Sequence, residues 1–181
     1  KYVPTLDKPE PQEPLNKWIL ARLKETTIDY VDNLNNYKII KATRLLRPFV
    51  DDLSTWYIRR SRDQIRDGNK EYLDTLYYVL VEFCKLMSPV TPLLAEHLYQ
   101  SLNAGNITNL KSVSTDVFTK YQDVNKQEKQ ILEIMQISRQ IVSMALSLRT
   151  SSEVKIRQPL STLYIQSVNN ISDKQIDDKV I

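Results

Sequence analysis

Basic side chains concentrate in one short stretch of this 181-residue chain. Between Lys38 and Arg62 there are seven Lys or Arg and two Asp, whereas the whole chain carries a net charge of only +3. Arginine binds phosphate through planar, paired hydrogen bonds. Trp56 and Tyr57 lie just before the arginines at the end of this stretch, and aromatic rings in such a setting can stack on unpaired bases. These residue types together favour binding to a nucleic acid.

The same stretch has the period of an amphipathic helix, which we expect to span about 38–66. The predicted apolar face consists of Ile39, Ala42, Leu46, Phe49, Leu53 and Trp56, and the predicted polar face of Lys41, Arg44, Asp52, Thr55, Arg59, Arg62 and Arg66. At ~1.5 Å per residue the polar face is roughly 37 Å long, the scale of a nucleic-acid stem. Trp56 lies on the predicted apolar face, which favours packing in the core. Tyr57 could either pack in the core or stack on a base.

Catalytic and metal-binding patterns are weak. His97 is the only histidine, and neither histidine nor cysteine supplies the partners that a metal site needs. Asp51 and Asp52 are adjacent, so on a helix their side chains point about 100° apart and do not converge. Cys84 cannot form an intramolecular disulfide and lies in an apolar run, where we expect a small buried residue in a reduced, intracellular protein. We expect no catalytic residue and no metal site in this chain.

The remaining sequence predicts an all-α fold, a helical bundle of about five helices with a short β-containing C-terminal tail. The predicted helices span about 15–34, 38–66, 69–87, 92–102 and 126–149. Gly68 is expected to cap the second helix, and Asn125 and Glu128 to cap the fifth. Pro48 should bend the second helix or divide it in two at that point. We expect 103–124 to be a long irregular connection.

Alternating residues in 154–157 and 162–166 predict the short strands of the tail. The expected organisation is a linker from a preceding domain over 1–14, a helical bundle over 15–152 and the start of an incomplete C-terminal domain over 153–181. The chain does not begin with Met and ends within an incipient helix, which suggests a piece of a longer protein. No run of ~18–20 uninterrupted apolar residues occurs, so we expect no membrane partner.

Four segments, taken in order, resemble the anticodon-binding domain of class I aminoacyl-tRNA synthetases. They are Asn16–Leu23, Phe49–Arg62, Leu86–Glu96 and Lys155–Leu160. The first and third are shared with valyl and leucyl enzymes. The Arg-Arg-Ser-Arg run in the second and the Arg-Gln-Pro-Leu run in the fourth are most similar to isoleucyl-tRNA synthetases. The catalytic signatures of the family's nucleotide-binding domain do not occur in this sequence.

The resemblance implies a domain that binds the anticodon arm of tRNA, with isoleucine tRNA expected, in a cytoplasmic isoleucine–tRNA ligase. The implied tRNA-binding residues are Trp56, Tyr57, Arg59, Arg60, Arg62, Lys41 and Arg44. The implied partners are the tRNA anticodon arm and the remaining domains of the same synthetase. For the full-length family the resemblance implies ATP as a cofactor and leaves zinc open, and no cofactor is expected in this segment. The alternatives are the same domain of a valyl- or leucyl-type enzyme and a helical protein-interaction scaffold, which would need an exposed apolar groove.

Overall fold

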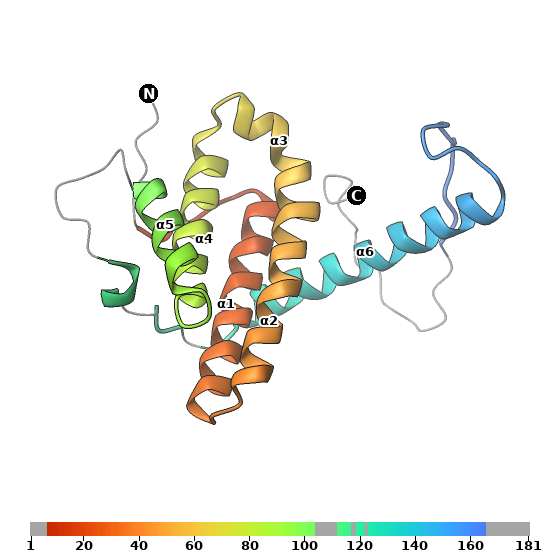
Figure 1. The fold of residues 1–181 in the computed structure, drawn as a ribbon. Coiled ribbons are helices and arrows are strands. Elements are labelled where there is room, and N and C mark those ends of the chain that lie inside the picture. The colour runs from red at the N-terminus through yellow and green to blue at the C-terminus, as the bar shows by residue number, and fades with distance from the viewer. Residues whose placement is uncertain (1–6, 104–111, 117–118, 122, 166–181) are drawn as a thin grey trace. The chain divides into compact units, whose positions relative to one another are not determined.

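A computed structural model describes residues 7–103, 112–116, 119–121 and 123–165. Every regular element in these residues is helical, which confirms the predicted all-α class (Figure 1). The elements are α1 (Pro14–Asn35), α2 (Ile39–Asp51), the π-helical segment η1 (Asp52–Ile58), α3 (Arg59–Arg66), α4 (Lys70–Met87), α5 (Pro92–Asn103), the 3₁₀ turn η2 (Val113–Thr115) and α6 (Lys126–Ser151). Because α2, η1 and α3 follow one another without a break, they form one continuous rod, and five helical rods result.

The chain divides into two compact units, Lys1–Lys129 and Gln130–Ile181. The first unit contains α1 to α5 and the beginning of α6. Within it, α1 contacts α2, η1 and α4, while α4 also contacts α3 and α5. Figure 1 shows α1 and α2 as antiparallel neighbours. The expected boundaries at 14 and 152 stay predictions.

Large apolar and aromatic side chains from α1, the rod and α4 form the core of the first unit. Ile19, Leu23 and Tyr30 of α1 have no exposed surface, nor has Phe49 of the rod. The rings of Phe49 and Phe83 stack with their centroids 5.2 Å apart. This burial holds the inner side of the rod against α1 and α4, and it leaves the outer side of the rod in solvent.

Helix ends follow the predicted capping chemistry. Gly68 has φ +79, a left-handed conformation that terminates α3, as predicted. Asn125 and Glu128 form the predicted reciprocal cap of α6. The Asn125 backbone N–H donates to Glu128 Oε2 at 2.8 Å, and the Glu128 backbone N–H donates to Asn125 Oδ1 at 2.9 Å.

Pro48 lies inside α2, and the helix continues past it. The alternative of two helices meeting at Arg47–Pro48 is therefore wrong. The exposed proline removes one backbone donor, and burial of Leu46 and Phe49 on either side of it holds the helix together. The irregularity of the rod lies further on, in η1.

No strand forms in the described part of the tail, 154–165, so the expected strand at 154–157 is wrong. Arg149 Nη1 donates to the carbonyls of Lys155, Ile156 and Gln158, at 3.2, 3.3 and 2.8 Å. These contacts wind the chain around one guanidinium, which is incompatible with an extended strand. Residues 162–165 are likewise not a strand, and Gln166, the end of the second expected strand, lies outside the described residues.

Among the described helices, α6 alone is long and apolar enough to cross a membrane by length and composition. That criterion is also met by core helices of soluble proteins, and two charged residues, Glu133 and Arg139, interrupt the apolar part of α6.

Candidate nucleic-acid interface

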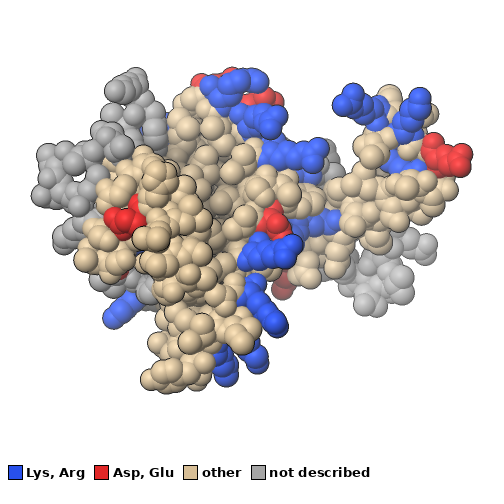
Figure 2. Space-filling view, viewed as in Figure 1, with Lys and Arg blue, Asp and Glu red and all other residues tan. Residues whose placement is uncertain are grey.

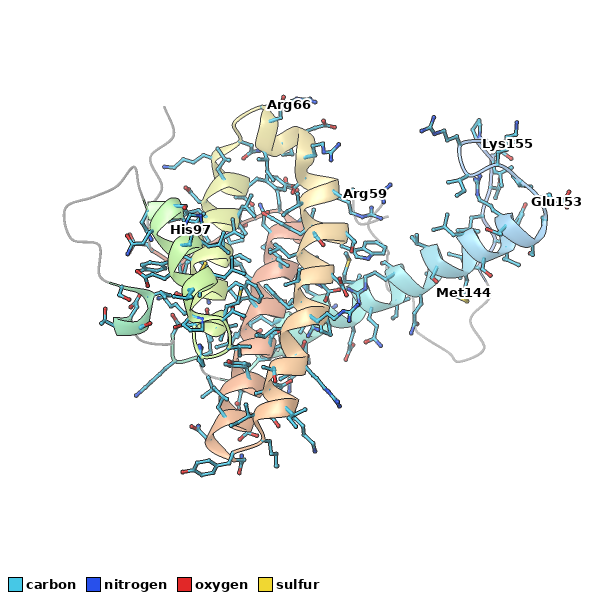
Figure 3. All side chains as sticks on the ribbon, viewed as in Figure 1. Arg59, Arg66, His97, Met144, Glu153 and Lys155 are labelled. Atoms are coloured by element: carbon cyan, nitrogen blue, oxygen red, sulfur yellow. The ribbon has the colours of Figure 1, made fainter. Side chains whose placement is uncertain are left out.

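Exposed cations follow the outer side of the rod formed by α2, η1 and α3. Figure 2 shows Lys and Arg side chains gathered along this rod. We call this surface the basic face, and its exposed members are Lys38, Lys41, Arg44, Arg47, Arg59, Arg62 and Arg66. Figure 3 shows Arg59 pointing away from the rod, with Arg66 at its far end.

Most of the basic face is not neutralised by neighbouring carboxylates. Arg66 pairs with Asp63 at 3.0 Å and with Asp67 at 3.2 Å, and all three side chains are exposed. Across the residues that the structure describes, Lys41, Arg44, Arg59 and Arg62 form no ion pair. Their charge is therefore available to an anionic partner in solution.

Two lysines of the first unit are held internally. Lys24 pairs with Glu128 at 2.8 Å, and Lys85 pairs with Glu82 at 2.7 Å and with Asp116 at 3.1 Å. Burial opposes the charged form of Lys85, but the two carboxylates outweigh it and raise its pKa. These lysines neutralise the interior and do not belong to the basic face.

The π-helical segment η1 changes the expected placement of Trp56 and decides that of Tyr57, which the sequence left open. Tyr57 has no exposed surface, whereas Trp56 is partly exposed. A π-helix uses more residues per turn than an α-helix, so the α-helical period that places Trp56 on the apolar face fails across these residues. The sequence-based placement of Trp56 in the core is therefore wrong, and Tyr57 takes that place.

Trp56 carries a cation on its ring. The guanidinium carbon of Arg60 lies 4.6 Å from the centre of the Trp56 ring, a cation–π arrangement. Partial burial lowers the pKa of Arg60, with a further contribution from Arg59, but an arginine keeps its charge at neutral pH. Trp56 and Arg60 thus form a partly exposed, planar, positively charged pair beside the basic face.

Buried hydrogen bonds hold the inner side of η1. The Tyr57 hydroxyl donates to Asn16 Oδ1 at 2.7 Å, and Asn16 Nδ2 donates to Glu71 Oε1 at 2.9 Å. Glu71 Oε1 also accepts from the backbone N–H groups of Gln12 and Glu13, at 3.1 and 3.0 Å. This chain of bonds joins α1, η1 and α4, and we call it the Asn16–Tyr57–Glu71 network.

The network also affects ionisation. Burial opposes ionisation of Glu71, but the hydrogen bonds from Asn16, Glu13 and Gln12 lower its pKa below the ordinary value. Burial raises the pKa of Tyr57, with smaller contributions from Tyr72 and Glu71, so its hydroxyl remains a donor at neutral pH. Tyr57 therefore positions the helix and offers no ring surface to a base.

Asp52 departs from the predicted polar face. Its carboxylate is buried and accepts a hydrogen bond from Arg22 Nε at 2.8 Å, while Arg22 Nη1 donates to Glu25 at 2.7 Å. Burial opposes the charge on Arg22, but these two carboxylates raise its pKa. Asp52 lies at the start of η1 and is held to α1 by this pair with Arg22.

The residues considered for catalysis are dispersed. His97 is exposed on α5 (Figure 3), Asp51 is exposed on α2, and Asp52 is paired with Arg22. Burial raises the pKa of Cys84 to about 11, which agrees with the predicted buried, unreactive thiol. Within the described ranges, no group of three or more His, Cys, Asp or Glu could hold a metal ion.

Sequence reasoning missed some contributors to this surface. Arg47 and Lys38 are exposed on the basic face but were not among the expected contacts. Their place in the stretch between Lys38 and Arg62 was the signal that could have included them. Asn16 and Glu71 are isolated polar residues, and no spacing in the sequence indicates that they meet at Tyr57.

Comparisons with known proteins all lead to tRNA ligases. Residues 16–164 match the family described as the anticodon-binding domain of tRNA ligase. The isoleucine–tRNA ligase of Picrophilus torridus is 32% identical over 175 residues, which cover 93% of this chain and 16% of that protein. The isoleucine–tRNA ligase of Bacteroides thetaiotaomicron is 36% identical over 171 residues, 90% of this chain and 14% of that protein. The isoleucine–tRNA ligase of Porphyromonas gingivalis is 33% identical over 175 residues, which cover 93% of this chain and 14% of that protein. The chain thus spans about a seventh of the length of the curated relatives it matches.

Proposed function

Because this chain belongs to the family of anticodon-binding domains of tRNA ligases, we propose that its basic face binds the anticodon arm of a tRNA. The observation that carries the proposal is the set of four exposed cations on the rod that form no ion pair with the described residues, namely Lys41, Arg44, Arg59 and Arg62. Exposed charge of one sign that remains unneutralised is hydrated and attracts an anionic partner over a distance, and the repulsion among the cations is screened by salt.

The proposed mechanism divides the contacts into two kinds. Lys41, Arg44, Arg59 and Arg62 contact phosphates and orient the arm along the rod. Unpaired bases of the loop are then read by stacking and by hydrogen bonds to their edges, and Trp56 with Arg60 lies where it can contribute. Arg59 and Arg62 are close in the sequence, so they can bind neighbouring phosphates of one RNA backbone. Tyr57 is left out because its side chain is fully buried.

We further propose that the cognate tRNA is that of isoleucine. The support is the Arg-Arg-Ser-Arg run at 59–62, the Arg-Gln-Pro-Leu run at 157–160 and the similarity to isoleucine–tRNA ligases at about 30% identity. In this proposal the chain is part of a cytoplasmic ATP-dependent ligase. The remaining domains of that ligase are its protein partners and carry the catalytic residues.

Salt dependence tests the binding proposal. The logarithm of tRNA affinity should fall linearly with the logarithm of salt concentration, with a slope of about −0.7 to −0.9 for each phosphate that the protein neutralises. Four phosphate contacts predict a slope of about −3. Filter binding of the 181-residue chain to tRNA at several salt concentrations measures it. A flat profile would exclude the basic face as the binding surface.

A competition assay tests the isoleucine assignment separately. Labelled isoleucine tRNA is bound to the chain and displaced with unlabelled isoleucine, valine or leucine tRNA. Isoleucine tRNA should displace the label at the lowest concentration. Preferential displacement by valine or leucine tRNA would assign the domain to that enzyme, and equal displacement by all three would show that this segment does not select the tRNA.

A further inference from the structure

The π-helical segment η1 gives Trp56 an orientation that a regular helix would not. Leu53 and Tyr57 are buried with Ser61 on the inner side of the rod, and Trp56 lies partly exposed between them. Two hydroxyl groups bond to carbonyls in the preceding turn. Ser54 Oγ donates to the Val50 carbonyl at 2.8 Å, and Thr55 Oγ1 donates to the Asp51 carbonyl. Such bonds compete with the backbone ladder and help to keep a widened turn.

The inner side of η1 is held against two other helices. The Tyr57 hydroxyl donates to Asn16 of α1, and the Tyr57 ring stacks on Tyr72 of α4 with centroids 6.5 Å apart. Within the rod, Ser61 Oγ donates to the Tyr57 carbonyl at 2.7 Å. A rotation of the rod that turned Trp56 inward would break the contacts with Asn16 and Tyr72. It would also leave the amide oxygen of Asn16 buried without its donor, since Asn16 has no exposed surface.

The outer side of η1 carries a surface suited to a flat ligand. The Arg60 guanidinium lies over the Trp56 ring at 4.6 Å, and both side chains are partly exposed. A planar guanidinium on an indole extends the stack and adds positive charge to it, so an unpaired base can continue the same stack. Arg59 and Arg62 lie on either side of Arg60 in the sequence and are exposed, where they can bind the phosphates on both sides of that base.

We propose that Trp56 and Arg60 form a stacking platform for one unpaired RNA base, and that Tyr57 and Asn16 are positioning residues that hold η1 in the register presenting it. The proposal rests on the proposed binding of an RNA stem-loop. It goes further by assigning a base contact to one pair of side chains and a positioning role to two buried residues that touch no RNA.

Fluorescence of Trp56 provides a direct readout. The chain contains two tryptophans, and Trp18 is only 3% exposed, so a change caused by RNA is expected from Trp56. The 181-residue chain is titrated with an RNA stem-loop and, separately, with an RNA duplex that has no unpaired bases. The stem-loop should quench the fluorescence, and the duplex should bind with a similar salt slope but without quenching.

Two substitutions of Trp56 separate stacking from charge. Trp56→Ala should abolish the quenching and weaken stem-loop binding about tenfold, within the range of base–aromatic stacking, while the salt slope is unchanged. Trp56→Phe keeps a ring and should recover most of the lost affinity. Stem-loop binding without quenching, or with full affinity in Trp56→Ala, would overturn the platform and leave the basic face intact. No binding of either RNA would instead refute the proposed function itself.

The positioning role has a matched control within the same bundle. Tyr57→Phe and Tyr77→Phe each remove a buried hydroxyl that donates to an asparagine Oδ1 at 2.7 Å, Asn16 in one case and Asn103 in the other. Both variants should lose comparable stability in urea. Only Tyr57→Phe should reduce the quenching by the stem-loop, about threefold in amplitude, without a change in salt slope. Equal quenching in the two variants would overturn the positioning role of Tyr57.

Discussion

Charged residues behave in opposite ways on the rod and around Lys85. On the basic face, Arg59 and Arg62 project into solvent without an ion pair among the described residues. In what we call the internal charge cluster, Lys85 of α4 is 11% exposed and pairs with Glu82 and with Asp116, which follows η2. Tyr99 of α5 donates to the same Asp116 carboxylate at 3.0 Å. The same kinds of side chain therefore stabilise the fold in one region and remain available to a partner in the other.

Burial explains the difference. Removing a charge from water is costly unless an opposite charge and hydrogen bonds replace the solvent, so each buried member of the internal charge cluster has a partner. Burial raises the pKa of Tyr99 to about 12, and its hydrogen bond to Asp116 contributes to the same shift. On the basic face water already satisfies the cations, and repulsion among them is screened by salt. A partner can replace that water without disturbing the core.

The largest expected effect comes from breaking the internal charge cluster. Lys85→Ala leaves Glu82 and Asp116 without their shared cation. The free energy of unfolding should fall by about 3 kcal/mol, the lower end for a broken buried pair because Asp116 keeps some contact with solvent. Urea denaturation measures it. Lys70→Ala, at an exposed position at the start of α4, is the control and should change stability by less than about 0.5 kcal/mol. Equal stability of the two variants would contradict the comparison.

Substitutions on the basic face should weaken tRNA binding and leave stability almost unchanged. Arg59→Ala combined with Arg62→Ala should weaken tRNA binding by tenfold or more and make the salt slope shallower by about 1.4 to 1.8, because two phosphate contacts are lost. Stability should change by less than about 0.5 kcal/mol. Lys126→Ala, which removes one exposed charge at the start of α6, is the control for net charge. If it weakens binding as much as the double variant, total charge rather than the basic face governs affinity.

Two neighbouring aspartates test the comparison within the rod itself. Asp52→Asn keeps the shape of the side chain but removes the charge that Arg22 contacts, so stability should fall by about 1–2 kcal/mol. Asp51→Asn removes an exposed negative charge beside the basic face, so tRNA affinity should rise about twofold while stability stays constant. Urea denaturation measures the stability of both variants, and filter binding measures their tRNA affinity. If the two variants do not differ in either quantity, the two side chains share one environment and the comparison fails.

The smallest expected effect is a change in the way stability depends on pH when Glu71 is replaced. Hydrogen bonds hold the folded-state pKa of Glu71 below its ordinary value of about 4.3, so its contribution to stability is present above that pH and is lost as the pH falls further. Urea midpoints measured from pH 7 to pH 3 should fall less in Glu71→Gln than in the unaltered chain. A larger fall in the variant would contradict the lowered pKa.

The sequence was sufficient for the helices and for most of the basic face. Apolar spacing and end signals such as Gly68 and the Asn125–Glu128 cap act within a few residues, so they operate before any tertiary contact forms. Clustering of Lys and Arg between Lys38 and Arg62 is also a local property. A local pattern of this kind predicts which side of a helix is charged, provided that the helix keeps one period.

Only the tertiary structure decides which residues lie on the inner side of the rod. Trp56 was misplaced and Tyr57 could not be placed because η1 changes the helical period, and η1 is held by Asn16 and Tyr72, which lie far from it in the sequence. Asp52 was misplaced because the sequence does not show that Arg22 of α1 meets its carboxylate. The predicted strand at 154–157 failed for a related reason. Alternation in the sequence cannot reveal that Arg149 binds the carbonyls of that segment.

By itself, the sequence determined the all-α class, the helix ends and the concentration of positive charge on one helix, because these depend on neighbours within a turn or two. Only the tertiary structure decided which aromatic ring reaches the surface beside that charge. That choice depends on a buried hydroxyl–amide–carboxylate contact among α1, η1 and α4, whose geometry exists only when the three are packed together.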